Sequence, residues 1–570
     1  MPSRRPAAVR PPRAAGGVDE PPRGRRRVVR WLGAELVALV VVVVLASIGT
    51  GHAIGGVKRR LLLDDGDSVV LPLFVESLRR GEAFEWTMSP VLFVFPELPL
   101  YLVSDLVTTG VAAALLTNAV VNVVVLYLLF RAVTRSLLPA AGQAAAAAAA
   151  VAGTALFVGC TLLEFRYVGN TAEIATLFYS NTYYSGTVMS CLATLALGAR
   201  LLRGDATRRS VVASASGLAL VAALSVLSNP LYLLWAVAPA GVALAVTWAV
   251  RRTGWRTVVV LAVASLGGSA VGYVGRIPLA PYIAATSDQY FRSDLVDLSA
   301  SFYRGILREL VTSHKGQLEA AVFLGLVVVS VVGLVVALVR RASGPVTFAF
   351  AASVATSVVV PVVVVQVGSL AARYLLPVFF VPLAVGVVSL VVVLERAAAR
   401  APAGAARRRV PLLVAAVAVV AAVVAFGTAP IARVVTEARG PGYPAASCLT
   451  DWADGRDAVG VGQFWQVRPL QVYGGDDVRL LQAHGDLSVF PWLSNLAPYQ
   501  GADPSYLVVS GLDLEDWSAT LDELGAPTDT VACGDYTIYD YEGAPGEALL
   551  DSTVDRSAES EGEERGFTGW

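Results

Sequence analysis

The chain has 570 residues, of which 55% are hydrophobic and only 15% are charged. Soluble globular domains carry about 25% charged residues, so the composition excludes an ordinary soluble protein and predicts a polytopic membrane protein. The 44 basic and 44 acidic residues cancel in net charge. They are unevenly distributed along the chain, however, and that distribution predicts the orientation in the membrane.

Residues 1–30 are rich in Arg and Pro and show no apolar periodicity, so they are expected to form a disordered cytoplasmic tail. The first apolar run, Trp31 to Ile54, is long enough to cross about 30 Å of hydrocarbon. Ten more candidate spans follow it. They run near 111–130, 142–163, 185–199, 211–228, 231–250, 257–275, 320–339, 346–367, 374–394 and 410–430.

The links between these spans alternate in character. One set is short and rich in arginine, and the other consists of longer loops of mixed charge at 55–92, 164–184 and 276–319. If the arginine-rich set is cytoplasmic, eleven spans place the N-terminus inside and the C-terminus outside. The scarcity of lysine also suggests a GC-rich bacterial genome, so the expected location is a bacterial plasma membrane.

The first outer loop carries most of the candidate chemistry, because Asp64, Asp65 and Asp67 follow the first span directly. An amphipathic helix, Leu71 to Arg80, comes next and is expected to lie in the membrane surface. The alternative is that the three acids are simply solvated. Glu97 favours function, since a carboxylate in an apolar, proline-broken segment must face a cavity or a partner.

Two arginines are candidates for binding a lipid phosphate. Arg373 stands at the outer mouth of a span, beside Tyr374, where a guanidinium can hold a phosphate with two hydrogen bonds. It could equally serve as a topological anchor. Arg166 lies in the second outer loop among several tyrosines, which suit sugar binding but also fit an aromatic belt at the interface.

Residues 431–543 read as a small extracytoplasmic α/β domain, with short strands near 455–465, 476–484, 504–511 and 535–541 and a helix near 516–525. Its two cysteines, Cys448 and Cys533, could form one disulfide if the domain lies in an outer compartment. Residues 544–570 are acidic and poor in apolar side chains, so they are expected to be disordered.

These features together resemble the GT-C superfamily of integral membrane glycosyltransferases. The resemblance is carried by the acids after the first span, the following interfacial helix, Arg373 with the residues after it, and the outer C-terminal domain. It implies inverting transfer of a hexose or pentose from a polyprenyl-phosphate donor to an envelope glycan or lipid on the outer face. It also implies a base among Asp64, Asp65, Asp67 and Glu97, and a donor phosphate held by Arg373 and Arg166.

Two other functions stay open at this point: a lipid or polysaccharide transporter or flippase, and a non-catalytic envelope scaffold. The scarcity of acids within the spans counts against a transporter. Only three histidines are present, widely separated, so no His-based zinc site is indicated. Of cofactors, only a divalent cation, Mg²⁺ or Mn²⁺, stays open. Membrane lipids are expected partners and nucleic acids are not.

Overall fold

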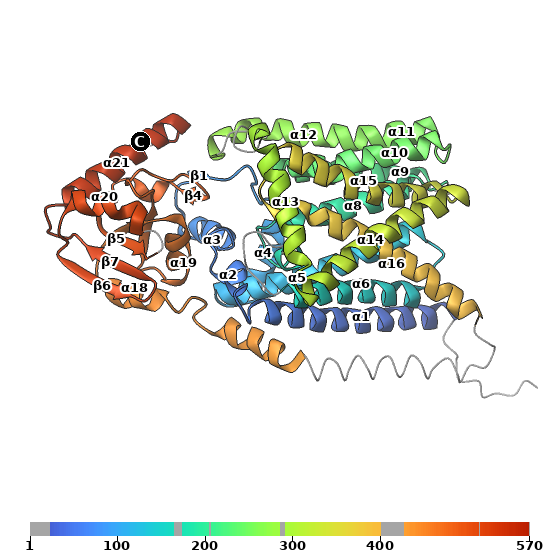
Figure 1. Ribbon diagram of the computed structural model, residues 1–570, viewed down its shortest axis with the longest axis horizontal. Coiled ribbons are helices and arrows are strands. Elements are labelled where there is room, and N and C mark those ends of the chain that lie inside the picture. The colour runs from blue at the N-terminus through green and yellow to red at the C-terminus, as the bar shows by residue number, and fades with distance from the viewer. Residues whose placement is uncertain are drawn as a thin grey trace, which may run out of the picture.

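The computed structural model of the chain describes residues 23–164, 174–204, 207–284, 291–400, 427–511, 514–568 and 570. A bundle of long helices occupies one half of the molecule, and a small domain built on a sheet lies beyond one end of it (Figure 1). The predicted fold class is confirmed: a helical polytopic membrane protein with a small C-terminal α/β domain.

Among the described residues, eight helical segments are long and apolar enough to cross a membrane, and two shorter apolar helices accompany them. All of them overlap predicted spans, whereas most of the predicted span at 410–430 lies outside the described residues, so the total of eleven stays a prediction. The bundle comprises α1 (Arg23–Ala53), α5 (Val111–Leu137), α6 (Gln143–Leu163), α8 (Ser185–Leu201), α9 (Arg208–Ser228), α10 (Ala238–Ala249), α11 (Trp255–Ala262), α12 (Gly268–Gly275), α14 (His314–Val339), α15 (Gly344–Gln366) and α16 (Leu376–Arg400). Short helices α7 (Ile174–Leu177) and α13 (Val296–Leu310) complete it.

Helix α1 begins at Arg23, although the sequence predicts disorder up to residue 30. Pro22 is the last proline before the span, and arginine is a good helix former. The helix of the first span therefore extends backward through the arginine-rich residues. Residues 1–22, the rest of the predicted tail, lie outside the described residues.

Three short helices, α2 (Arg59–Leu63), α3 (Val70–Arg80) and α4 (Glu97–Leu106), lie between the bundle and the C-terminal domain (Figure 1). Helix α3 is the predicted amphipathic helix, and it ends at Gly81 in the left-handed conformation that favours glycine. Its Leu71 and Val75 are buried while Leu78 is half exposed. The protein itself therefore covers most of the apolar face that the sequence assigns to the membrane surface.

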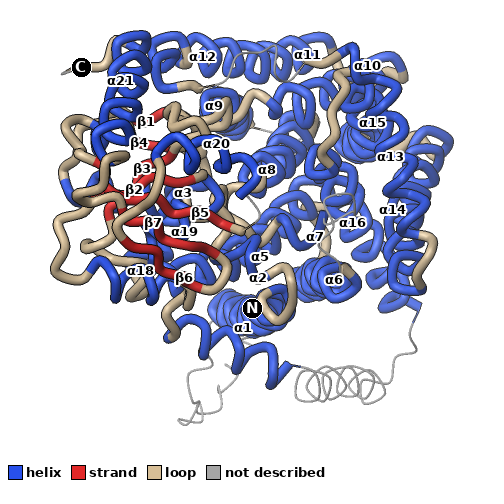
Figure 2. The backbone as a smooth tube through the Cα atoms, turned by 60° about the vertical axis from the view of Figure 1, so that its left-hand side comes forward, coloured by secondary structure: helices blue, strands red, loops and turns tan. Residues whose placement is uncertain are grey.

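The C-terminal domain is a five-stranded mixed sheet with helices on both faces (Figure 2). Its strand order is β3-β2-β5-β7-β6; β2 runs parallel to β3 and β5, and β7 is antiparallel to β5 and β6. The predicted strands and helix are all present. The elements are α18 (Ala446–Ala453), β2 (Val459–Gly462), α19 (Phe464–Tyr473), β3 (Arg479–Gln482), β5 (Pro504–Ser510), α20 (Leu514–Leu524), β6 (Asp529–Cys533) and β7 (Tyr536–Asp540).

A separate two-stranded sheet joins the first outer loop to this domain. Strand β1 (Trp86–Thr87) pairs antiparallel with β4 (Ser494–Asn495). Trp86 is therefore held against the C-terminal domain.

The acidic segment after residue 543 is not disordered as predicted. It forms helix α21 (Glu547–Arg565), which packs Leu550, Val554 and Ala558 into the core of the domain. These three residues recur every four positions and so make one narrow apolar stripe on an otherwise acidic helix. The average composition of the segment hides that stripe, and the domain extends at least to Arg565.

Cys448 and Cys533 form a disulfide that joins α18 to β6 across 85 residues of sequence. We expect the Cys448→Ser/Cys533→Ser variant to unfold at lower urea, because removing a bridge over a loop of this length costs roughly 2–5 kcal/mol. Tryptophan fluorescence of the full chain in detergent measures the midpoint. The matched control is Cys160→Ala/Cys191→Ala, which removes the two free buried cysteines; equal midpoints in the two variants would contradict the prediction.

Candidate functional site

The acidic residues form a turn between α2 and α3, at the end of the bundle that faces the C-terminal domain. Asp65 is 3% exposed and accepts a hydrogen bond from the backbone N–H of Asp67 at 3.1 Å. Asp64 instead forms an ion pair with Arg59 at 2.8 Å, and Arg59 also pairs with Glu437 at 3.1 Å. Asp64 therefore ties the turn to the chain that leads into the C-terminal domain.

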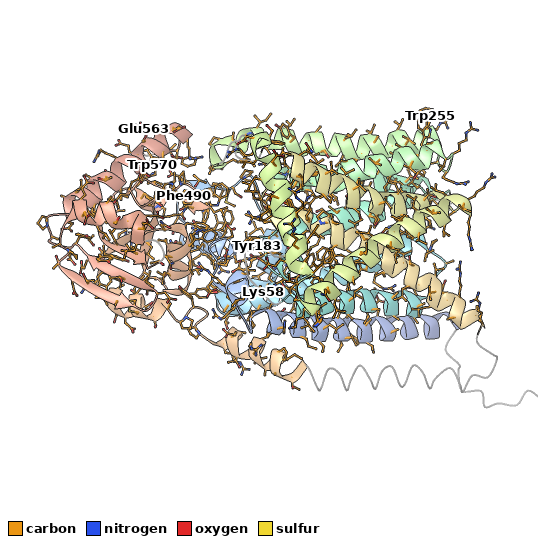
Figure 3. The ribbon with its side chains drawn as sticks, in the orientation of Figure 1. Lys58, Tyr183, Trp255, Phe490, Glu563 and Trp570 are labelled. Carbon is orange, nitrogen blue, oxygen red and sulfur yellow. A yellow bond between two sulfur atoms is a disulfide. The ribbon has the colours of Figure 1, made fainter. Side chains whose placement is uncertain are left out.

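Asp65 and Asp67 are grouped around the hydroxyl of Tyr183, which donates to Asp65 Oδ1 at 3.0 Å. Tyr183 comes from the second outer loop and lies at the junction of the bundle and the domain (Figure 3). Its hydroxyl is also close enough to Asp67 to affect the pKa of that carboxyl. The structure thus brings two carboxyl groups and one phenol together from distant parts of the sequence.

The two carboxyl groups differ in their surroundings. Burial, together with the charge of Asp67, raises the pKa of Asp65 to about 7. Burial also raises the pKa of Asp67, but the positive charge of Arg373 opposes that effect. Like charges held close together cannot both ionise freely. Near neutral pH the pair therefore retains a proton, while the charge of Arg373 favours the ionised form of Asp67.

Arg373 stands in the short turn that precedes α16, as the sequence predicts for the mouth of a span. Its guanidinium carbon lies 5.8 Å from the ring centres of both Tyr183 and Tyr374. Its Nε is buried and forms no hydrogen bond with any described residue. The guanidinium is thus oriented by aromatic rings and retains a donor for a ligand.

Helix α19 of the C-terminal domain packs directly on the acidic turn. A Cβ on Gly66 would lie 2.6 Å from the ring of Phe464, so the absence of a side chain at Gly66 permits this close approach. At the end of the same helix, the hydroxyl of Tyr473 donates to the backbone carbonyl of Leu63 at 2.7 Å. The turn that carries the acids is therefore covered by a helix that comes about 400 residues later in the sequence.

The same helix places Arg468 close to Asp67. Arg468 is 3% exposed, and burial lowers the pKa of its guanidinium to about 10, which still leaves it charged at neutral pH. The charges of Asp67 and Arg468 act on one another, as do those of Asp67 and Arg373. Two cations therefore act on Asp67, one from the bundle and one from the C-terminal domain.

Glu97 is not part of this group by any contact that the described residues make. It begins α4, is 3% exposed, and lies against Gly186 at the start of α8, where a Cβ would come within 2.4 Å of its Oε1. Burial raises the pKa of Glu97 to about 8. Burial therefore favours the neutral form of this carboxyl, as it does for Asp65 and Asp67.

Of the residues predicted from sequence, the structure brings Asp65, Asp67 and Arg373 together. Asp64 pairs with Arg59 instead, and Glu97 lies against Gly186, which follows shortly after Tyr183 in the sequence. Arg166 lies outside the described residues. Sequence analysis missed Tyr183, whose loop is rich in tyrosine, and Arg468, which is one of several arginines in the outer domain. No spacing in the sequence connects either residue to the acids.

The group fits a divalent cation poorly. Within the described ranges, no three His, Cys, Asp or Glu side chains are placed to hold a metal ion. Asp65 and Asp67 offer two carboxylates, but the charges of two guanidinium groups already act on Asp67. Mg²⁺ prefers six oxygen ligands. A requirement for Mg²⁺ or Mn²⁺ therefore stays a prediction, and no step below depends on one.

Comparison with known proteins gives a likeness of fold. No family model matches the sequence, and no curated protein matches it. The structure is similar to two crystal structures of ArnT from Cupriavidus metallidurans. The first, bound to undecaprenyl phosphate, is 16% identical, with a TM-score of 0.46 over 90% of this chain and 98% of that chain. The second, in the apo state, is 15% identical, with a TM-score of 0.49 over 91% and 98%. Likeness at this level does not define a reaction or a substrate.

Proposed function

We propose that this chain is a membrane glycosyltransferase that moves a sugar from a polyprenyl-phosphate donor to an envelope acceptor. The observation that carries the proposal is the Asp65–Asp67 pair at one end of the spans. The hydroxyl of Tyr183 donates a hydrogen bond to Asp65, and the charge of Arg373 acts on Asp67. A base beside a phosphate-binding cation is what a glycosyl transfer of this kind requires.

In the proposed reaction, Asp67 accepts the proton of the acceptor hydroxyl while that oxygen bonds to the anomeric carbon of the donor. The bond between the anomeric carbon and the phosphate oxygen breaks, and its electron pair leaves with the polyprenyl phosphate. Arg373 stabilises the negative charge on that phosphate. Asp65 and Tyr183 hold Asp67 in place and adjust its pKa.

Two observations support an outer-face location with a cytoplasmic N-terminus. The arginine-rich links lie at the ends of the spans away from the acidic turn, as the positive-inside rule expects of cytoplasmic links. The disulfide in the C-terminal domain is typical of an oxidising compartment. Both agree with a bacterial plasma membrane in which the site faces outward.

The proposal is tested with the full chain purified in detergent, undecaprenyl-phosphate sugars as donors, and membrane extract as the source of acceptor. Release of undecaprenyl phosphate that requires both protein and extract is the expected result. If no sugar donor gives release above that of heat-inactivated protein, the enzyme function is wrong, and a scaffold or a transporter would be favoured.

The transfer rate should fall as the pH is lowered through about 7. The pKa of Asp65 is raised to about 7, so both carboxylates are charged only above that pH. Below it the Asp65–Asp67 pair already holds a proton and accepts another from the acceptor hydroxyl less readily. The Asp65→Asn variant should shift the midpoint of the kcat profile to lower pH, because it removes the like charge beside Asp67. Profiles from pH 5 to 9 measure this, and identical midpoints in the two proteins would refute it.

A further inference from the structure

A cavity of about 180 Å³ lies between the first outer loop and the C-terminal domain. Helix α3 and strand β1 form one wall, and α19, β3 and β4 form the other. A cavity of about 150 Å³ holds a benzene ring. This cavity therefore has room for a single six-membered ring.

The charges at the rim of the cavity are paired with one another. Arg79 forms ion pairs with Asp105 and Glu76. Arg80 pairs with Glu76 at 3.4 Å and with Asp476 at 2.6 Å. Both arginines at the rim therefore have carboxylate partners within the protein, and neither needs an anion from a ligand.

Arg468 is different, because it lines the interior of the cavity and is almost fully buried. Neither Nε nor Nη2 of its guanidinium forms a hydrogen bond with any described residue. A buried charge with unused donors is costly to the folded protein unless a ligand supplies acceptors. An anion in the cavity would meet that need with two hydrogen bonds in the plane of the guanidinium.

The walls around Arg468 are aromatic and held in position. The ring of Trp86 lies 5.7 Å from the guanidinium carbon, and its indole N–H donates to Ser77 at 3.1 Å. The hydroxyl of Tyr499 donates to the backbone carbonyl of Gln482 and accepts from its N–H, each at 2.7 Å. The side-chain Oε1 of Gln482 is buried and makes no hydrogen bond with the described residues. Rings of this kind pack on sugar faces, and a free amide oxygen accepts a hydroxyl.

We propose that this cavity binds one sugar ring that carries an anionic group, a carboxylate or a phosphate, as part of the acceptor glycan. The guanidinium of Arg468 holds the anionic group, Trp86 packs on the ring, and Gln482 accepts a hydroxyl. The inference rests on the proposed function, because Arg468 stands on α19, whose Phe464 packs on Gly66 of the acidic turn and so joins the cavity to that turn. An acidic acceptor bound here would be held by the helix that covers the acidic turn.

The test is direct binding to the full chain in detergent by isothermal titration calorimetry. The probes are methyl glucuronide, glucose 6-phosphate and the neutral methyl glucoside. At least one anionic probe should bind about tenfold or more tightly than the neutral one, as expected for charge-assisted hydrogen bonds. The anionic probe that binds more tightly shows whether the anionic group of the ligand is a carboxylate or a phosphate.

Two variants locate the binding. Arg468→Gln should weaken the favoured probe about tenfold or more, and Arg468→Lys, which keeps the charge, should retain part of the affinity. The matched control is Arg479→Gln, which removes a half-exposed arginine of the same domain that pairs with Asp457 and should leave binding unchanged. If a variant folds poorly, the comparison of the three probes on the unmodified chain still tests whether the cavity prefers an anionic sugar.

The inference is overturned if the neutral probe binds as tightly as both anionic ones, if no probe binds, or if Arg468→Gln binds like the control. Release of undecaprenyl phosphate is assayed on the same samples. Release without binding of an anionic sugar rejects this cavity and keeps the transferase. Binding without release from any donor rejects the transferase and keeps the cavity as a binding site.

Discussion

The Asp67→Asn variant is expected to release undecaprenyl phosphate at least about a hundredfold more slowly than the unmodified chain, since general-base catalysis contributes roughly 10²- to 10⁴-fold. Asparagine has nearly the same shape as aspartate and keeps an acceptor for Tyr183, but it cannot take a proton at neutral pH. The effect should appear in kcat, because the proton is transferred during the chemical step. Single-turnover assays with preloaded donor measure it.

The control for this variant is Asp294→Asn. Asp294 is an exposed outer-loop carboxylate that pairs with Arg292 at 2.7 Å and lies outside the acidic turn. The Asp294→Asn variant should release undecaprenyl phosphate at the same rate as the unmodified chain. Equal rates for the Asp67 and Asp294 variants would show that Asp67 is not the base, and the transferase would then have to use another carboxylate.

The Arg373→Gln variant is expected to lose about ten- to a hundredfold in kcat/KM and to bind undecaprenyl phosphate more weakly, since a hydrogen bond to a charged group contributes roughly 1.5–3 kcal/mol. Gln keeps the size of the side chain but not its charge. Lysine at this position should restore part of the loss, because it holds a phosphate as a point charge without the flat fork of arginine. Quenching of tryptophan fluorescence by added undecaprenyl phosphate measures binding apart from turnover.

Arg292→Gln is the matched control, because Arg292 is an exposed arginine on an outer loop whose guanidinium already pairs with Asp294. It should leave both binding and turnover unchanged. If Arg373→Gln binds undecaprenyl phosphate as tightly as this control, Arg373 is an anchor of the span and not a ligand of the donor.

The sequence predicts the membrane bundle well because each span is a local signal, a continuous apolar run of sufficient length. The amphipathic helix α3 is predicted equally well, with its end at Arg80, because apolar periodicity is also a local signal. Helix α21 was missed for the opposite reason. Three apolar residues on an acidic helix raise the average hydropathy too little to be noticed, yet they are enough to anchor it.

The site could be predicted only in part, because its geometry is made by distant segments. The sequence places Asp64, Asp65 and Asp67 in one short turn, but it does not show that Asp64 pairs with Arg59 while the other two meet Tyr183. Those assignments depend on which way each side chain leaves a tight turn. Arg468 was unpredictable for the same reason, since its role comes from the packing of α19 on residues about 400 positions earlier.

The contact between α19 and the acidic turn also sets an order of events in the life of the chain. Tyr473 and Leu63 are 410 residues apart. At roughly 5–20 residues per second, synthesis of that stretch takes about 20–80 s. During this time the turn is made and the first spans can insert, while the helix that covers it does not yet exist. A ribosome-stalled or truncated chain would hold its acids without Phe464 or Arg468 beside them, so the proposed sugar transfer should begin only after the C-terminal domain has folded.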